Sequence, residues 1–221
     1  MSEFWSNRSV VVTGGNGFLG RVVVARLADL GARVVAPTHD QYDLTVPGAA
    51  DAMLAAYSPT HVIHLAARVG GIGYNQVAPA PLYLDNLMMG THIIEAKETG
   101  TDHIDVWGTG SASREYLYVE DAAAAIVRAA ESHEGTEPIN LGSDSEITIR
   151  ETAETIASVV GYTGTLQWDS TKPDGQPRRR IDATRAEQLL GWKAAMNFRD
   201  GLTTTVDWYL ANRAAAEAAP R

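Results

Sequence analysis

Three evenly spaced glycines between an apolar run and a helical pattern constrain this fold most. Residues 9–13, SVVVT, are typical of a buried strand, and apolar residues recur at helical spacing over 19–30. Between them, Gly14 permits a sharp turn, Gly17 lets the backbone approach a pyrophosphate, and Gly20 lets the helix pack closely on the strand. The spacing predicts a dinucleotide-binding turn that opens a helix. A tight turn with a purely structural role is the alternative.

The kind of dinucleotide depends on the residues that follow the second strand, where a carboxylate would bind the ribose hydroxyls of NAD. Thr38 and His39 occupy this place, and Asp40 lies further along. Because no carboxylate stands at the strand tip, a 2′-phosphate would not be repelled there. The sequence favours NADP, with Thr38 or His39 as the phosphate contact, while Asp40 leaves NAD open.

The order of patterns along the chain predicts a doubly wound, Rossmann-like α/β sheet. Strands are expected over 32–36 and 61–66, with helices over 49–57 and 81–97. The second half predicts further strands and helices. We expect strands at 103–107 and 137–143, helices over 119–132 and 148–161, a polar loop over 169–180 and two closing helices. Thr148 and Glu151 have capping-box spacing.

Composition excludes several classes of function. The chain has 221 residues, no cysteine and a net charge of −9, so it can form neither disulfides nor thiolate metal sites, and it is unsuited to nonspecific binding of nucleic acid or anionic membranes. The scattered aspartates show no metal-ligand spacing, so no metal site is predicted. With no signal-peptide pattern and no long apolar span, we expect a soluble, cytoplasmic protein.

Several segments together resemble one family. They are TGGNGFLG, HVIHLAARVGGIG, DNLMMGTHIIEA, VWGTGSASREYLYVEDAA, KPDGQPRR and LLGWK. These resemble the extended short-chain dehydrogenase/reductase (NAD-dependent epimerase/dehydratase) family, and most closely its NADP-dependent epimerase–reductases acting on GDP-4-keto-6-deoxymannose. The resemblance implies a dinucleotide-binding part over 1–100 and a smaller, nucleotide-sugar-binding part over 101–221.

The resemblance also implies roles for individual residues. On the cofactor side these are Gly14, Asn16, Gly17, Phe18, Leu19, Gly20, Thr38, His39, Leu65, Ala66 and Ala67. The sugar side would be formed by Val69, Gly70, Gly71, Trp107, Arg114 and Lys172. An indole can stack on a flat surface, and the two cations can neutralise a diphosphate. The alternatives are a tryptophan in the core and two solvated surface cations.

The chemistry of this family is missing. Its reductases need a tyrosine proton donor with a lysine four residues later, and its epimerases use a cysteine and a histidine. Four residues before the only lysines, Lys97, Lys172 and Lys193, stand isoleucine, tryptophan and leucine, so no catalytic residue is assigned. Where about a hundred residues with two strands and the catalytic serine are expected, the chain has only KETGTDH. His64 is expected to be a satisfied histidine at a strand end.

These observations leave three hypotheses. The chain is a family enzyme that is impaired or inactive in this form, or a noncatalytic module that binds a dinucleotide or a nucleotide-sugar. The third is that a segment of the natural protein is absent from this sequence. Loss of two central strands would expose a sheet edge, so we expect a homodimer in which a partner covers the gap, or a rearranged sheet.

Overall fold

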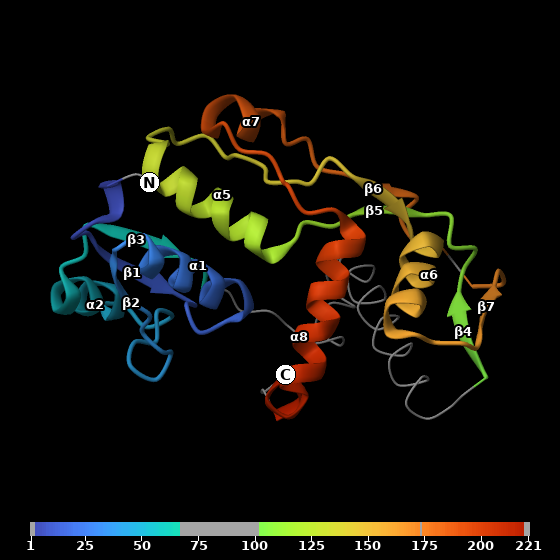
Figure 1. Ribbon diagram of the computed structural model, residues 1–221. Coiled ribbons are helices and arrows are strands. Elements are labelled where there is room, and N and C mark those ends of the chain that lie inside the picture. Colours follow the sequence, from blue (N-terminus) through green and yellow to red (C-terminus); the bar gives the residue numbers. More distant parts are fainter. Residues whose placement is uncertain (1–2, 67–101, 173, 219–221) are drawn as a thin grey trace. The chain divides into compact units, whose positions relative to one another are not determined.

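The computed structural model describes residues 3–66, 102–172 and 174–218, and these fall into two compact units. Unit 1 combines Met1–Arg68 with Leu117–Leu141 and Asp182–Ala194, and unit 2 combines Val69–Tyr116, Gly142–Ile181 and Ala195–Arg221. Both units are therefore assembled from segments far apart in the chain (Figure 1). The assignment of cofactor binding to 1–100 and sugar binding to 101–221 stays a prediction.

Unit 1 contains a parallel sheet in which β1 (Ser9–Thr13) lies between β2 (Arg33–Val35) and β3 (His61–His64). Val11 of β1 is opposite Val35 on one side and Val62 on the other. Parallel neighbours need crossover connections, and α1 (Phe18–Asp29) and α2 (Ala49–Tyr57) lie in these connections. The described part of the chain thus confirms the Rossmann-like α/β class.

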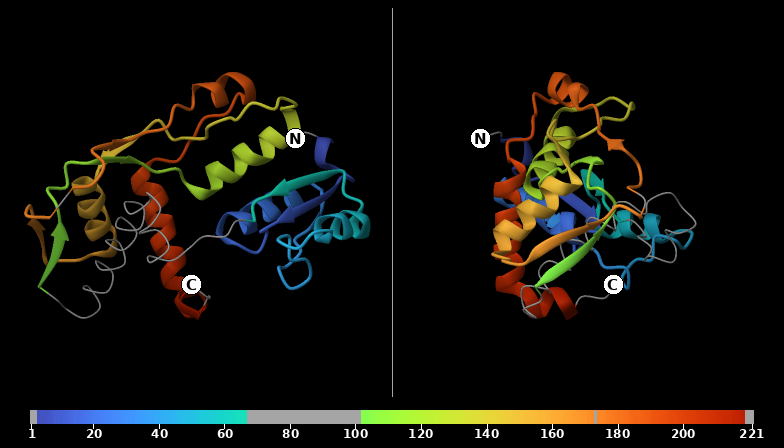
Figure 2. Two further views of the ribbon diagram at one scale, coloured as in Figure 1. Left: turned by 180° about the vertical axis from the view of Figure 1, so that it is seen from behind. Right: turned by 90° about the vertical axis from the view of Figure 1, so that its right-hand side faces the viewer.

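The core of unit 1 joins this sheet to two helices. Val10, Val12 and Ile63 of the sheet pack with Val23 and Leu27 of α1 and with Ala123 and Val127 of α5 (Val119–Ser132), and Trp5 of η1 (Glu3–Trp5) completes the cluster. Figure 2 shows from behind that α5 runs along one side of the β1–β3 sheet. The short α7 (Thr184–Leu190) is attached to α5 because Arg128 Nε donates a hydrogen bond to the Leu190 carbonyl, at 3.2 Å.

Unit 2 has its own core beneath a two-stranded parallel sheet. β4 (His103–Trp107) pairs with β7 (Thr165–Asp169), and β4 alternates exposed and buried residues along its length. Ile104 and Val106, its buried residues, pack with α6 (Ile149–Val160) and with Val206 of α8 (Phe198–Ala218). This alternation leaves His103, Asp105 and Trp107 on the other face of the sheet.

A second small sheet in unit 2 brings three distant segments together. β5 (Ser113–Glu115) pairs antiparallel with β6 (Glu146–Thr148) and parallel with β8 (Arg178–Arg179). Helix α6 follows β6 directly, and Thr148 is its N-cap. The predicted capping box is confirmed, because Thr148 Oγ1 accepts from the Glu151 backbone N–H while the Glu151 carboxylate accepts from the Thr148 N–H.

Two local predictions were wrong. Residues 137–143 contain no strand in the described structure, because a strand needs a hydrogen-bonding neighbour and the described sheet of unit 1 ends at β3. The expected loop over 169–180 contains β8, which forms because β5 supplies the pairing partner. The helix expected over 81–97 lies outside the described residues. No helix in the described ranges is long and apolar enough to span a bilayer.

Candidate functional site

Close packing around Gly14 and Gly20 shapes the predicted dinucleotide turn. Gly14 has φ +68°, and a Cβ there would lie 2.6 Å from the Ala66 nitrogen at the exit of β3. A Cβ at Gly20 would overlap the Gly14 carbonyl oxygen and would lie 2.6 Å from the Gly15 Cα. Both positions therefore need glycine, which brings the first turn of α1 against the strand ends.

The N-terminus of α1 faces this turn without a side-chain cap. Gly17 is the N-cap, forms no side-chain capping hydrogen bond, and no acidic residue occupies the first turn. A Cβ at Gly17 would meet only the Gly14 carbonyl oxygen, at 3.2 Å. A helix end with free N–H groups and no carboxylate suits a phosphate, which supplies both the negative charge and the acceptors.

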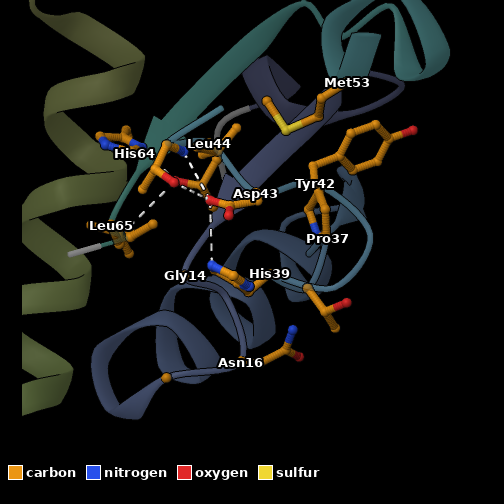
Figure 3. A pocket seen from close by; sticks show the side chains of 15 residues that line it. Gly14, Asn16, Pro37, His39, Tyr42, Asp43, Leu44, Met53, His64 and Leu65 are labelled. Carbon is orange, nitrogen blue, oxygen red and sulfur yellow. Dashed lines mark hydrogen bonds and ion pairs between the residues drawn. The ribbon is translucent and has the colours of Figure 1, made fainter. Parts of the chain in front are cut away.

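A cavity of about 720 Å³ opens beside the turn (Figure 3). Seven predicted cofactor residues line it, namely Gly14, Asn16, Gly17, Thr38, His39, Leu65 and Ala66. Sequence reasoning missed the other lining residues, which are Thr13, Pro37, Tyr42, Asp43, Leu44, Thr45, Met53 and His64. Most of these lie in the loop after β2. This loop folds back onto the strand ends, and local sequence periodicity cannot predict such a contact.

The loop after β2 carries the polar groups at one side of the cavity. Thr38 is engaged within the loop, because its backbone N–H donates to Gln41 Oε1 at 2.9 Å. His39 is 76% exposed, and its Nε2 lies 3.4 Å from Asp43 Oδ1 (Figure 3). Asp43 also accepts from the Thr45 backbone N–H at 3.0 Å. The carboxylate lining the cavity is thus Asp43, whereas Asp40 is not among the lining residues.

The remaining cofactor-side predictions have different outcomes. Phe18 is 66% exposed and Leu19 packs against the core of unit 1, and neither lines the cavity. His64 has the partner expected of a satisfied histidine, because its Nδ1 lies 2.6 Å from Thr13 Oγ1. Ala67 and the sugar-side residues Val69, Gly70 and Gly71 lie outside the described residues.

In unit 2 the structure brings together two predicted sugar-side residues. Trp107, at the end of β4, is 68% exposed, so the alternative that it belongs to the core is wrong. Lys172 Nζ lies 5.4 Å from the centre of the Trp107 ring, within the range of a cation–π contact. An exposed indole beside an ammonium group offers both a stacking surface and a positive charge.

Asp174 fastens the loop that carries Lys172 to the turn after Trp107. Its Oδ1 accepts hydrogen bonds from the backbone N–H of Thr109 at 2.5 Å and of Gly110 at 3.3 Å, and its Oδ2 accepts from Thr109 Oγ1 at 2.7 Å. Hydrogen bonds from the Thr109 side chain and backbone lower the pKa of the Asp174 carboxyl from its ordinary value. The aspartate of the KPDG motif therefore has a structural role, which is to hold the two loops together.

Arg114 lies in β5 and is only 5% exposed, so it is not a solvated surface cation. Its Nη1 donates to the carbonyl oxygens of Ser113 at 2.5 Å and Gln176 at 2.9 Å, which attaches it to the same loop. Its Nε and Nη2 are buried and have no hydrogen-bond partner among the described residues. Burial lowers the pKa of this guanidinium from its ordinary value.

Two family models match the sequence, and their matches overlap. The NAD dependent epimerase/dehydratase family matches residues 10–102, and the GDP-mannose 4,6 dehydratase family matches residues 87–205, more than half of the chain. This chain belongs to the epimerase/dehydratase family. The first match includes the glycine turn, and the second includes the segments around Trp107 and Lys172.

Curated relatives are similar to this chain in sequence. GDP-L-fucose synthase 1 of Arabidopsis thaliana is 29% identical over 302 aligned positions, which include 92% of this chain and 93% of the relative. GDP-L-fucose synthase of Escherichia coli is 40% identical over 163 positions, 65% of this chain and 50% of the relative. The 302 positions exceed the 221 residues of this chain, so at least 81 positions, the difference, have no counterpart here.

Solved structures share the fold of this chain. A GDP-L-fucose synthetase from Naegleria fowleri superposes with a TM-score of 0.81 at 20% identity, over 97% of this chain and 95% of the other. The same protein bound to NADP gives a TM-score of 0.80 over 98% and 97% of the two chains, also at 20% identity. At this identity the likeness shows the fold alone.

In the described part of the chain, Lys172 and Lys193 have the following neighbours. Lys172 faces Trp107, and Lys193 Nζ lies 4.0 Å from the Glu187 carboxylate. Lys97 lies outside the described residues. Among the residues that the structure describes, no three His, Asp or Glu side chains are grouped to hold a metal ion.

Proposed function

We propose that unit 1 binds NADP in the cavity beside the glycine turn. The observation that carries this proposal is the uncapped N-terminus of α1 opening onto a cavity lined by seven predicted cofactor residues. The pyrophosphate would be bound by the backbone N–H groups in the first turn of α1, which follows Gly17, and Leu65 and Ala66 would contact the cofactor where β3 ends. A solved relative of the same fold has NADP bound, which supports the choice of cofactor.

We further propose that unit 2 binds a GDP-sugar. Trp107 would stack on the ligand, while Lys172 and Arg114 would neutralise its diphosphate. This assignment is supported by the contact between Trp107 and Lys172 and by Nε and Nη2 of Arg114, which are buried and have no hydrogen-bond partner among the described residues. Curated relatives named GDP-L-fucose synthase also support it. The proposed ligand class is therefore a GDP-4-keto-6-deoxy sugar.

The third part of the proposal is that this form binds its ligands without reducing or epimerising them. The sequence contains neither Tyr-x-x-x-Lys nor any cysteine, so the proton donor of the reductase and the thiol of the epimerase are both missing. Each acid–base group of this kind contributes roughly 10²- to 10⁴-fold to the rate. The protein then acts as a noncatalytic binding module or subunit.

The cofactor proposal can be tested at Gly17 without damage to the fold. Gly17→Asp supplies a helix cap and a negative charge, whereas Gly17→Ser supplies a cap alone. We expect Gly17→Asp to keep the thermal midpoint but to weaken NADPH binding by tenfold or more in calorimetry, and Gly17→Ser to weaken it less. If NADPH fails to bind the wild-type chain at millimolar concentration, the proposal is wrong.

The preference for NADP over NAD can be tested at His39. If the imidazole contacts the 2′-phosphate, His39→Ala should weaken NADPH binding several-fold and leave NADH binding unchanged, because only NADPH carries that group. Asp40→Ala is the matched control in the same loop and should affect neither. Equal affinity of the wild-type chain for the two cofactors would contradict the assignment.

The catalytic proposal is tested by following NADPH absorbance with GDP-4-keto-6-deoxymannose. We expect no oxidation above the rate without protein. Turnover of about 1 per second or more, which is ordinary for an enzyme, would show that other groups have replaced the missing pair. In that case the noncatalytic part of the proposal would be abandoned and the binding assignments would stand.

A further inference from the structure

The turn over residues 108–112 follows the exposed Trp107 and is held on two sides. On one side, the Asp174 carboxylate accepts hydrogen bonds from two backbone N–H groups of the turn. Gly108 also donates its N–H to the carbonyl oxygen of Asp169, the last residue of β7, at 2.9 Å. These bonds attach the N–H groups of the turn to the end of β7 and to the loop that follows it.

On the other side, the carbonyl groups of the turn accept hydrogen bonds from the start of α6. The Ile149 N–H donates to the Ala112 carbonyl at 2.8 Å. The Arg150 N–H donates to the Gly110 carbonyl at 3.0 Å. Ile149 and Arg150 are the first two residues of the helix, where N–H groups have no acceptor within the helix itself. The turn therefore supplies acceptors to the helix start, and the helix start fixes the turn.

The side chain of Arg150 adds a further bond to the same turn. Its Nη2 donates to the Thr109 carbonyl at 2.6 Å, and its Cζ lies 4.3 Å from the centre of the Trp168 ring of β7. Gly110 packs against both side chains, because a Cβ there would lie 2.6 Å from the Trp168 ring and 3.0 Å from the Arg150 Cβ. The cation–π contact fixes the direction of the guanidinium, so the bond to Thr109 costs little further side-chain entropy.

From this arrangement we infer that Arg150 is a positioning residue for ligand binding by unit 2, and that it acts through Trp107. Trp107 is largely exposed, so packing alone fixes its indole only weakly, and its backbone leads directly into the turn that Arg150 holds. A side chain that is already held in its bound direction loses less entropy on binding, which raises affinity. The inference rests on the proposed binding of a GDP-sugar by unit 2. Arg150 is assigned a contact with the turn and none with the ligand.

The first test is calorimetry of the full chain with GDP-mannose. Arg150→Met keeps an aliphatic stem and good helix propensity but removes the guanidinium, and it should weaken binding about three- to tenfold, within the range of coupling between neighbouring residues. Arg150→Lys can still donate to the Thr109 carbonyl and should recover part of the loss. Arg199→Met is the matched control. It removes the arginine that donates to Ser158 Oγ at 3.0 Å near the other end of α6, and it should leave the affinity unchanged.

The second test separates positioning from a general loss of structure. The chain is labelled with fluorotryptophan, and the fluorine resonances of Trp107 and Trp5 are assigned with Trp107→Phe and Trp5→Phe. In the ligand-free protein, we expect Arg150→Met to shift or broaden the Trp107 resonance, and Arg150→Lys to do so less. Trp5 lies in the core of unit 1 and should keep its resonance in both variants. Arg199→Met should leave both resonances as in the wild type.

Four outcomes would overturn the inference. They are unchanged GDP-mannose affinity in Arg150→Met, a loss of affinity with an unchanged Trp107 resonance, an equal loss of affinity in Arg199→Met, and movement of the Trp5 resonance together with that of Trp107. In each of these the wild-type chain still binds GDP-mannose, so the proposed function of unit 2 stands. If the wild-type chain does not bind GDP-mannose, the proposed function fails, and the inference fails with it even if the Trp107 resonance moves.

Discussion

At the scale of single residues, the space available for a side chain differs between glycines that are equivalent in the sequence motif. A Cβ at Gly20 would lie 2.6 Å from the Gly15 Cα and would overlap the Gly14 carbonyl oxygen, whereas at Gly17 it would meet one atom at 3.2 Å. Gly20 is therefore needed for packing between turn and helix, and Gly17 keeps space open toward the cavity. The motif predicted both roles, and the structure shows the difference in space around the two glycines.

We predict that Gly20→Ala destabilises the protein by about 1–3 kcal/mol, the usual cost of overpacking a tight contact. The clash is with backbone, which cannot move aside without displacing the whole turn. Urea unfolding monitored by circular dichroism measures the change, and Gly17→Ala is the control with the smaller expected loss. A stability unchanged in Gly20→Ala would show that the turn adopts another conformation.

A second residue-scale prediction concerns pH. Hydrogen bonds from Arg178 and then Ser113 lower the pKa of Glu146 from its ordinary 4.5 to about 2. Because the folded-state pKa is depressed, the stabilisation is complete above about pH 4.5 and is lost as the pH falls through about 2. We expect Glu146→Gln to reduce the fall of the urea midpoint in this window. Glu154→Gln, an exposed position on α6, should leave that fall as in the wild type.

At the scale of elements, helix boundaries follow from local chemistry. The capping box that begins α6 could be predicted from Thr148 and Glu151, because the cap and the helix are adjacent in the chain. The prediction of a strand over 137–143 was wrong because a strand depends on a partner strand, which is not adjacent in the chain. Strand β8 likewise forms only because β5 lies beside it.

We predict that Thr148→Ala costs about 1 kcal/mol of stability, within the usual range of 0.5–2 for loss of an N-cap. The lost acceptor leaves the Glu151 N–H unpaired in the first turn. Thr155→Ala is a matched control within α6, where alanine is the better helix former, and should leave stability unchanged or raise it. Equal losses for the two variants would contradict the role of the cap.

At the scale of the whole molecule, the described sheet of unit 1 ends in an edge strand, and the chain is shorter than its relatives. The alignment with the Arabidopsis thaliana relative leaves at least 81 positions of 302 without a counterpart among the 221 residues here. In the described sheet of unit 1, β3 is at the edge, and its Val62 is 46% exposed. An exposed edge strand with an apolar side chain favours pairing with another chain.

We therefore propose a homodimer and predict concentration-dependent association in sedimentation velocity or light scattering. Val62→Lys, which places a charge on the edge strand, should weaken that association, while Val46→Lys, at an exposed valine in the loop before α2, should not. A wild-type chain that remains monomeric over the accessible concentrations would contradict the proposal. The cytoplasmic location stays a prediction.

The sequence by itself determined the features that depend on neighbouring residues. These are the glycine turn, the open start of α1, the capping box of α6 and the loss of Tyr-x-x-x-Lys. Only the tertiary structure decided that Trp107 is exposed beside Lys172, that Asp174 fastens their loop, and that Arg114 and Arg179 share a face. The physical reason is that these contacts join residues more than 60 positions apart, where strand register and chain closure, rather than local periodicity, choose the neighbours.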